Sequence, residues 1–296
     1  MPIPESQLAT WANQGSITQS STTYNTIKNA LENNRAAYAA KSFEVFLQGS
    51  YGNDTNIWSE SDVDVVIRLD SIMRSDLTAL PADQEQAYHR HYPKAIYTLK
   101  EFRDGVVSRL QSAFDAANVE LGTKAITIKA NGSRRKADVI VCHQYRKYAR
   151  FTSSSDEKFT PGILFPTNLY EEIINYPKLH SENCTLKHKA TSEWFKPMVR
   201  IFKNMRSKLV DDGIIPSDTA PSYFIEGMLY NVPQEKFGQS YANSFVNCIN
   251  WLYATDRSLL KCANEQYLLL GNSNVQWSAE KCNLFLSELI KLWKSF

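Results

Sequence analysis

Hydrophobic and polar positions recur along the first half of the chain with two different periods, and these periods predict a mixed α+β region. Apolar residues fall at helical spacing over residues 17–40 and 96–114, which predicts two amphipathic helices. Runs of β-branched and aromatic residues predict four strands, at residues 43–48, 63–69, 125–130 and 136–142. Asn131-Gly132-Ser133 is a turn signal between the last two strands. Residues 51–61 are polar and are expected to form a loop.

The pattern becomes helical in the second half of the chain. Residues 151–186 are aromatic and interrupted by prolines, so we expect them to be rich in loops. A stripe of apolar side chains from Phe195 to Leu209 then recurs at helical spacing, and further helices are predicted at residues 221–231, 239–255 and 278–295. We therefore predict an α+β fold with a mixed-sheet lobe over residues 1–150 and a mainly helical second lobe over residues 151–296.

Composition limits the classes of partner. The 33 basic and 31 acidic residues give a net charge of +2, which provides no global attraction to nucleic acid or to an anionic membrane. The five cysteines have no metal-ligand spacing, and their odd number argues against a complete disulfide framework. Residues 1–16 lack a basic segment followed by an apolar one, and no apolar run has membrane-spanning length. We expect a soluble, cytoplasmic protein without a membrane or stable nucleic acid partner.

Three aspartates occupy strand positions where a negative charge is costly. Asp62 and Asp64 alternate with valines, so both carboxylates project from one face of the strand. Asp138 lies in a second apolar strand. Carboxylates on one face repel each other unless a cation neutralises them, and hard oxygen ligands suit Mg²⁺, with Mn²⁺ as a substitute. We predict that these three aspartates are the metal ligands and the catalytic residues.

A two-metal site of this kind is suited to in-line displacement at the α-phosphate of a nucleoside triphosphate, with pyrophosphate as the leaving group. Asp138 is then expected to lie nearest the attacking hydroxyl. The segment Gln48-Gly49-Ser50 follows the first strand and is expected to bind the substrate. Gly49 allows the backbone to approach the phosphates, and Ser50 offers a hydroxyl and an N–H. An Asp-x-Asp pair or a Gly-Ser turn alone is commonly not catalytic, but their order and spacing with a third aspartate favour a catalytic role.

Together, the Gly-Ser turn, the Asp-x-Asp pair and the third aspartate resemble the signature of polymerase-β-like nucleotidyltransferases. The run QGSYGNDTNIWSESDVDVVIRL, followed by INYPKLHSEN, WFKPMVRIFKN and PSYFIEGMLYNVP, is similar to the bacterial cGAS/DncV-like nucleotidyltransferases (CD-NTases) of CBASS anti-phage defence, and most similar to their CdnE-like branch. This resemblance implies a catalytic first lobe and a nucleotide-binding second lobe. It also implies a cyclic di- or trinucleotide product that acts on a downstream cyclic-nucleotide-responsive effector.

The resemblance also implies roles for residues of the second half. Lys203 would place a charge on the triphosphate, Ser222 would add a hydroxyl, and the ring of Tyr223 would stack on a base. An asparagine amide can pair with uracil, and Asn175 and Asn183 are both candidates for this contact. Each of these residues also has an ordinary structural interpretation, since a helical lysine is usually solvated and a tyrosine is often packed. His180 and His188 are expected to be surface or supporting side chains.

Two other functions fit parts of the pattern. The same metal site serves transferases that add a single nucleotide to a protein, an RNA end or a small molecule, and the product distinguishes them from a cyclic nucleotide synthase. A noncatalytic nucleotide or RNA sensor is the alternative outside enzymes. That alternative leaves the three aspartates without an explanation, and the near-neutral charge gives it little support.

Overall fold

The computed structural model describes residues 2–59, 62–93, 95–166 and 171–296, and the chain divides into two compact units. The sheet unit consists of Thr18–Leu47 and Asp62–Pro177. The helical unit consists of Met1–Ile17, Gln48–Ser61 and Lys178–Phe296. Each unit therefore combines segments that are far apart in the sequence. A mixed sheet in one unit and helices in the other confirm the predicted α+β organisation.

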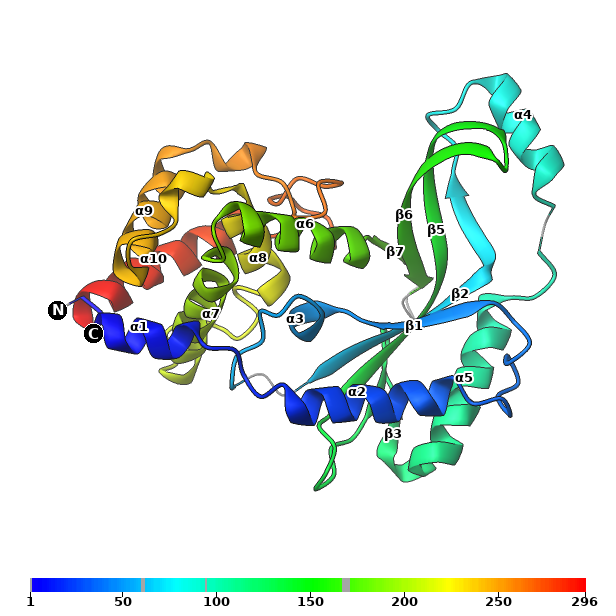
Figure 1. Cartoon of the computed structure of the whole chain (residues 1–296), viewed down its shortest axis with the longest axis horizontal. Coiled ribbons are helices and arrows are strands. Elements are labelled where there is room, and N and C mark those ends of the chain that lie inside the picture. The colour runs from blue at the N-terminus through cyan, green and yellow to red at the C-terminus, as the bar shows by residue number, and fades with distance from the viewer. Residues whose placement is uncertain (1, 60–61, 94, 167–170) are drawn as a thin grey trace. The chain divides into compact units, whose positions relative to one another are not determined.

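The sheet unit is built on one mixed sheet (Figure 1). Its strands are β1 (Phe43–Leu47), β2 (Val63–Asp76), β3 (Val119–Leu121), β4 (Ile126–Ile128), β5 (Ala137–Ser153), β6 (Asp156–Pro166) and β7 (Glu172–Asn175). The strand order is β1-β2-β5-β4-β3, and β6 pairs with β5 and β7. Strands β2 and β5 run parallel, whereas the other pairs are antiparallel. The two strands that carry the aspartates are therefore direct neighbours.

Three helices cover parts of this sheet: α2 (Thr18–Leu31), α4 (Ala82–His91) and α5 (Leu99–Phe114). Helices α2 and α5 pack against each other and against the sheet. Helix α5 begins after Thr98, whose side chain forms a reciprocal capping box with Glu101. Helix α4 packs on the extended part of β5 (Figure 1). The Tyr88 ring contacts Tyr148 and Phe151 there. This aromatic cluster supports the half of β5 that continues beyond the aspartate.

The helical unit is organised around α7 (Phe195–Asp211), whose predicted apolar stripe is buried. The other helices are α1 (Glu5–Ala12), α3 (Gly49–Gly52), α6 (Pro177–Ala190), α8 (Ser222–Asn231), α9 (Tyr241–Ala254) and α10 (Ala279–Ser295). Helices α1, α8, α9 and α10 all contact α7. All five cysteines of the chain are free and buried. Among the described residues, no helix is both long and apolar enough to cross a bilayer.

Several sequence predictions need correction. The prediction that residues 151–186 are rich in loops is wrong. The region contains the end of β5, all of β6 and β7, and most of α6. Proline is tolerated at Pro161 because β7 pairs with β6 only from Ile163 onward, which leaves Pro161 on an edge. The predicted domain boundary at residues 150 and 151 falls inside β5, and the compact units divide after Pro177 instead. The first predicted helix ends at Leu31, and helices α1, α3 and α4 were not predicted.

Candidate active site

The predicted site residues are distributed over both units. The three aspartates and Asn175 belong to the sheet unit. The remaining candidates belong to the helical unit: Gln48, Gly49, Ser50, Asn183, Lys203, Ser222 and Tyr223. Each group is built by its own secondary structure, and the geometry within each group tests the roles expected from the sequence.

The aspartates lie on one face of the β2–β5 pair. Asp64 and Asp138 are partners in the parallel register, so their side chains emerge side by side. The flanking residues Val63 and Val65 are fully buried, as the predicted alternation requires. Thr127 Oγ1 donates a hydrogen bond to Asp138 Oδ1 at 2.5 Å, and this bond orients the carboxylate. The sheet therefore brings two of the three predicted ligands together.

Asp62 is connected to this pair through a cation of the chain itself. The Lys136 ammonium donates to Asp62 Oδ2 at 2.7 Å and lies 3.6 Å from Asp138 Oδ2. The hydrogen bond to Asp62, and then the charges of Asp138 and Asp62, raise the pKa of Lys136 in spite of its partial burial. Lys136 lies just before β5 and two residues before Asp138, and its ammonium reaches the same face. A positive charge thus already lies between two of the predicted metal ligands.

This arrangement fits a divalent cation. Carboxylate oxygens on a partly exposed face are the ligands that Mg²⁺ prefers, and the position of Lys136 shows that the site attracts positive charge. The aspartate oxygens are more widely spread than those of a preformed cage: among the described residues, no group of three or more aspartates has ligand atoms all within 4.8 Å of one another. Asp62, Asp64 and Asp138 are the residues that would hold the ion. The sequence reasoning missed Lys136, although its spacing from Asp138 was a usable signal.

Lys136→Met should make the stability of the protein more dependent on Mg²⁺. Without Mg²⁺, the loss of partly exposed ion pairs should cost at most about 1 kcal/mol, or a fall of about 2–4 °C in Tm. Added Mg²⁺ should raise the Tm of the variant more than that of the wild type, because the ion no longer competes with an ammonium group. Thermal unfolding in EDTA and in Mg²⁺ measures both effects. Lys129→Met, which removes a surface pair with Glu120, is the control; equal Mg²⁺ responses in all three proteins would contradict the prediction.

In the helical unit, the Gly49-Ser50 segment forms the short helix α3 and contacts α7. Gly49 has a φ of 65°, a conformation that favours glycine. Ser50 Oγ accepts a hydrogen bond from Lys203 Nζ at 2.8 Å, and Lys203 also donates to the Thr55 carbonyl at 2.7 Å. The Gln48 side-chain oxygen is buried and has no hydrogen-bond partner within the described residues. Two predicted phosphate ligands, Ser50 and Lys203, therefore lie together.

The burial of Lys203 excludes the ordinary alternative of a solvated helical lysine, whereas its expected contact with the triphosphate stays a prediction. Its side chain is fully buried and donates hydrogen bonds to the Ser50 hydroxyl and the Thr55 carbonyl. Ser222 begins α8, and its hydroxyl accepts a hydrogen bond from Arg206 at 3.3 Å. The Tyr223 ring stacks on His180 at a centroid distance of 4.7 Å, and its hydroxyl accepts a hydrogen bond from Asn264. One face of the proposed base-stacking ring is thus covered by a side chain.

The two candidate asparagines have different surroundings. Asn183 lies in α6, and its amide nitrogen donates to the Ala263 carbonyl at 2.7 Å, which connects two parts of the helical unit. Asn175 is the last residue of β7, and its side-chain oxygen accepts from the Tyr176 backbone N–H at 2.8 Å. His180 is 2% exposed and contacts Glu226 and Tyr223, so of the two expected alternatives it is a supporting side chain and not a surface one. These contacts favour a structural role for Asn183.

Comparison with known proteins identifies the family. Residues 182–294 match the model of the cGAS/DncV-like nucleotidyltransferase C-terminal helical domain. The chain is 42% identical over 293 residues to the cyclic UMP-AMP synthase of Rhodothermus marinus, an alignment that covers 99% of this chain and 98% of that protein. It is 33% identical over 254 residues to the cyclic dipurine nucleotide synthase of Elizabethkingia meningoseptica, covering 86% and 85% of the two chains.

Solved structures give the same result. The structure of R. marinus CdnE c-UMP-AMP synthase with Apcpp and Upnpp matches with a TM-score of 0.89 and 40% identity, covering 100% of this chain and 98% of that one. The E. meningoseptica CdnE cyclic dinucleotide synthase with GTP and Apcpp matches with a TM-score of 0.79 and 28% identity. These matches confirm the polymerase-β-like fold expected from the sequence. The chain belongs to the CdnE-type cGAS/DncV-like nucleotidyltransferases.

Proposed function

We propose that this protein is a Mg²⁺-dependent synthase that joins nucleoside triphosphates, UTP among them, into a cyclic dinucleotide. The observation that carries the proposal is the pairing of Asp64 with Asp138 across parallel strands, with Lys136 held between Asp138 and Asp62. Similarity to proteins named as cyclic nucleotide synthases supports the class of product. We further propose that the product signals to a cyclic-nucleotide-responsive effector in anti-phage defence, as the CBASS resemblance implies.

The chemistry follows from the side chains. Bound at the aspartates, Mg²⁺ would supply charge neutralisation and Lewis acidity for the attack of a ribose hydroxyl on an α-phosphate. Asp138 accepts the hydroxyl proton as the new P–O bond forms and the bond to pyrophosphate breaks. Its Oδ1 is held by Thr127, which leaves Oδ2 as the oxygen that faces positive charge in this structure. A first transfer gives a linear dinucleotide that retains a triphosphate, and a second transfer closes the ring and releases a second pyrophosphate.

The Gly49-Ser50 segment and Lys203 bind the triphosphate in this scheme. The Ser50 hydroxyl can donate to a phosphate oxygen while it accepts from Lys203. The buried ammonium group then acts on the phosphates through a polarised hydroxyl, which strengthens the contact. This arrangement supplies binding and orientation, whereas proton transfer belongs to Asp138.

Pyrophosphate release tests the proposed reaction. The purified protein is incubated with Mg²⁺ and with ATP, GTP, CTP and UTP, singly and in pairs. A synthase that makes a UMP-containing cyclic dinucleotide releases two pyrophosphates per product. It converts the labelled nucleotide into a product that resists phosphatase. Label that stays sensitive to phosphatase, or that becomes attached to protein or RNA, would instead support the addition of a single nucleotide.

Base choice gives a prediction of its own. Asn175→Ser should shift incorporation from uracil toward purines by about tenfold, because serine cannot present the paired donor and acceptor that match uracil, a difference of about 1.4 kcal/mol. Asn183→Ser should instead leave base choice unchanged and lower stability by about 1 kcal/mol, since its amide binds the Ala263 carbonyl. Competition between labelled UTP, ATP and GTP, together with Tm, separates the two variants. An Asn175→Ser enzyme with unchanged uracil preference would refute this assignment.

A further inference from the structure

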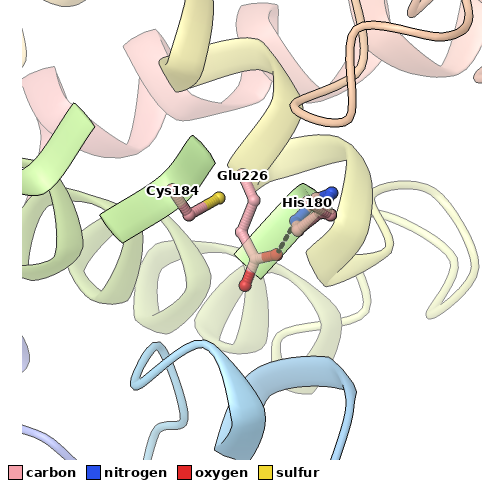
Figure 2. A group of neighbouring side chains, drawn as sticks. All are labelled: His180, Cys184 and Glu226. Carbon is pink, nitrogen blue, oxygen red and sulfur yellow. Dashed lines mark hydrogen bonds and ion pairs between the residues drawn. The ribbon is translucent and has the colours of Figure 1, made fainter. Parts of the chain in front are cut away.

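A buried carboxylate lies at the centre of a polar network in the helical unit. Glu226, in α8, is 2% exposed. A buried ionised side chain requires hydrogen-bonding or charged partners. Its oxygens accept hydrogen bonds from Asn53 Nδ2 at 2.9 Å, from His180 Nε2 at 2.6 Å, and from Thr55 Oγ1. Figure 2 shows His180 and Glu226 pointing toward one another from α6 and α8, with Cys184 one helical turn away from His180. Three separate segments therefore meet at one carboxylate.

The ligand atoms of His180, Cys184 and Glu226 lie within 4.8 Å of one another, which raises the question of a metal centre. The hydrogen bonds argue against one, because both oxygens of Glu226 already accept from protein donors. Burial also raises the pKa of the Cys184 thiol well above its usual value, which disfavours the thiolate that a metal requires. The cluster is instead a hydrogen-bonding hub.

The charge of this hub is balanced from α7. Burial alone raises the pKa of Glu226, but the hydrogen bond and charge of His180, the charge of Lys203 and the hydrogen bond of Thr55 outweigh burial and lower it. Lys203 is itself fully buried. Each of these two charges would be costly to bury without the other. Glu226 is therefore a counter-charge for the lysine that holds Ser50.

Thr55 connects the carboxylate to the proposed phosphate-binding segment. Its side chain donates to Glu226, its carbonyl accepts from Lys203 at 2.7 Å, and its N–H donates to the Ser50 carbonyl at 2.9 Å. One residue thus uses all three of its polar groups to relate Glu226, Lys203 and Ser50. The side-chain bond to Glu226 thus fixes the Thr55 backbone, to which both Ser50 and Lys203 are hydrogen-bonded.

His180 extends the network to the proposed base-stacking ring. It donates to Glu226 and stacks on Tyr223 with an interplanar angle of 22°. Asn264 fixes the other end of that tyrosine by donating to its hydroxyl at 2.9 Å. The Tyr223 ring is therefore held by His180 and Asn264, and His180 is bound by the same carboxylate that anchors Thr55.

We propose that Glu226 and His180 form a positioning pair for the donor nucleotide: Glu226 sets Ser50 and Lys203 through Thr55, and His180 sets the ring of Tyr223. Neither residue needs to touch the nucleotide. The inference rests on the proposed function, because it takes Ser50 and Lys203 to be triphosphate ligands. It accounts for the INYPKLHSEN and PSYFIEGMLYNVP motifs, which contribute His180 and Glu226.

The test measures triphosphate binding directly, with nonhydrolysable UTP and ATP analogues in titration calorimetry. Glu226→Gln and Thr55→Val should each weaken binding about tenfold, and the double variant should lose little more than either single one, because both break the same link. Thr55→Ser keeps the hydroxyl, so its affinity should stay within about twofold of the wild-type value. In turnover assays the change should lie mainly in KM, since Asp62, Asp64 and Asp138 are unaltered.

Met228→Ala is the control for instability. Met228 lies two residues after Glu226 in α8, is fully buried in the apolar core, and faces a different side of the helix. It should lower Tm while leaving analogue affinity within about twofold. Wild-type affinity in Thr55→Val, or an equal loss of affinity in Met228→Ala, would overturn the proposal. A wild-type protein that binds no triphosphate would instead remove the proposed function and this inference together.

Discussion

Asp64→Asn and Asp138→Asn, singly and together, should reduce nucleotide transfer by at least about 10³-fold while the protein remains folded. The two carboxylates are register partners on neighbouring parallel strands, so each change removes a charge from the same proposed metal site. Amide groups bind Mg²⁺ poorly and cannot neutralise its charge. The double variant should not be strongly destabilised, because it also removes the repulsion between adjacent carboxylates.

The measurement combines product yield, Tm and Mn²⁺ binding, with the binding monitored by electron paramagnetic resonance. The variants should lose Mn²⁺ binding as well as activity, which separates a ligand role from a purely structural one. Asp104→Asn is the matched control, because it makes the same charge change on the surface of α5, where Asp104 pairs with Lys100. Activity near the wild-type level in a folded double variant would show that these aspartates are not the catalytic centre.

Lys203→Ala should produce the second largest effect, on both binding and stability. Triphosphate affinity should fall by about one to two decades, because Ser50 loses the charge-assisted hydrogen bond that polarises its hydroxyl, a contact worth roughly 1.5–3 kcal/mol. Stability should also fall, by about 3 kcal/mol or about 6–12 °C in Tm, because the change strips hydrogen bonds from Ser50 and Thr55 and a counter-charge from Glu226.

Lys208→Ala separates these effects from the loss of any lysine on the same helix. Lys208 lies on α7, is partly exposed and pairs with Asp212 at 2.9 Å. It should change Tm by no more than about 1–2 °C and leave nucleotide affinity unchanged, as expected for a surface pair worth under about 0.5 kcal/mol. If Lys203→Ala destabilises the protein without weakening triphosphate binding, Lys203 is a structural residue alone.

The strands of the aspartate site could be predicted because local signals define them. Val63 to Leu69 and Lys136 to Cys142 are short apolar runs interrupted by charge, and each run became part of β2 or β5. The positive φ of Gly49 agrees with a glycine at this position, whereas its expected approach to phosphates stays a prediction. What the sequence could not supply was the register that places Asp64 beside Asp138, because that depends on pairing between residues more than seventy positions apart.

The polar partners of the site were the least predictable part. Lys136 appeared as one charged residue at the start of a strand, and its contacts with Asp62 and Asp138 depend on the folded sheet. Glu226 lies in the apolar run FIEGML, so its burial could have been noticed from helical periodicity alone. Its partners could not, since Asn53 and Thr55 come from a segment far away in the chain.

The region at 151–186 shows a limit of composition-based reasoning. Its prolines suggested loops, but β6 pairs with β5 along most of its length and carries Pro161 and Gly162 within it. Gly162 packs closely against the Asn175 carbonyl and the Tyr176 ring, where a Cβ would lie only 2.8 Å from that carbonyl oxygen. Here glycine marks a close approach between strands instead of a chain break.

Mass spectrometry of the products formed from ATP and UTP with Mg²⁺ tests the central claim most directly. The wild-type protein should yield a phosphatase-resistant cyclic dinucleotide that contains uridine monophosphate, and the Asp64→Asn/Asp138→Asn variant should yield none. The central claim would be contradicted if the folded wild-type protein, given all four nucleoside triphosphates, formed only linear or singly transferred products, or if the aspartate variant formed the same cyclic product at the same rate.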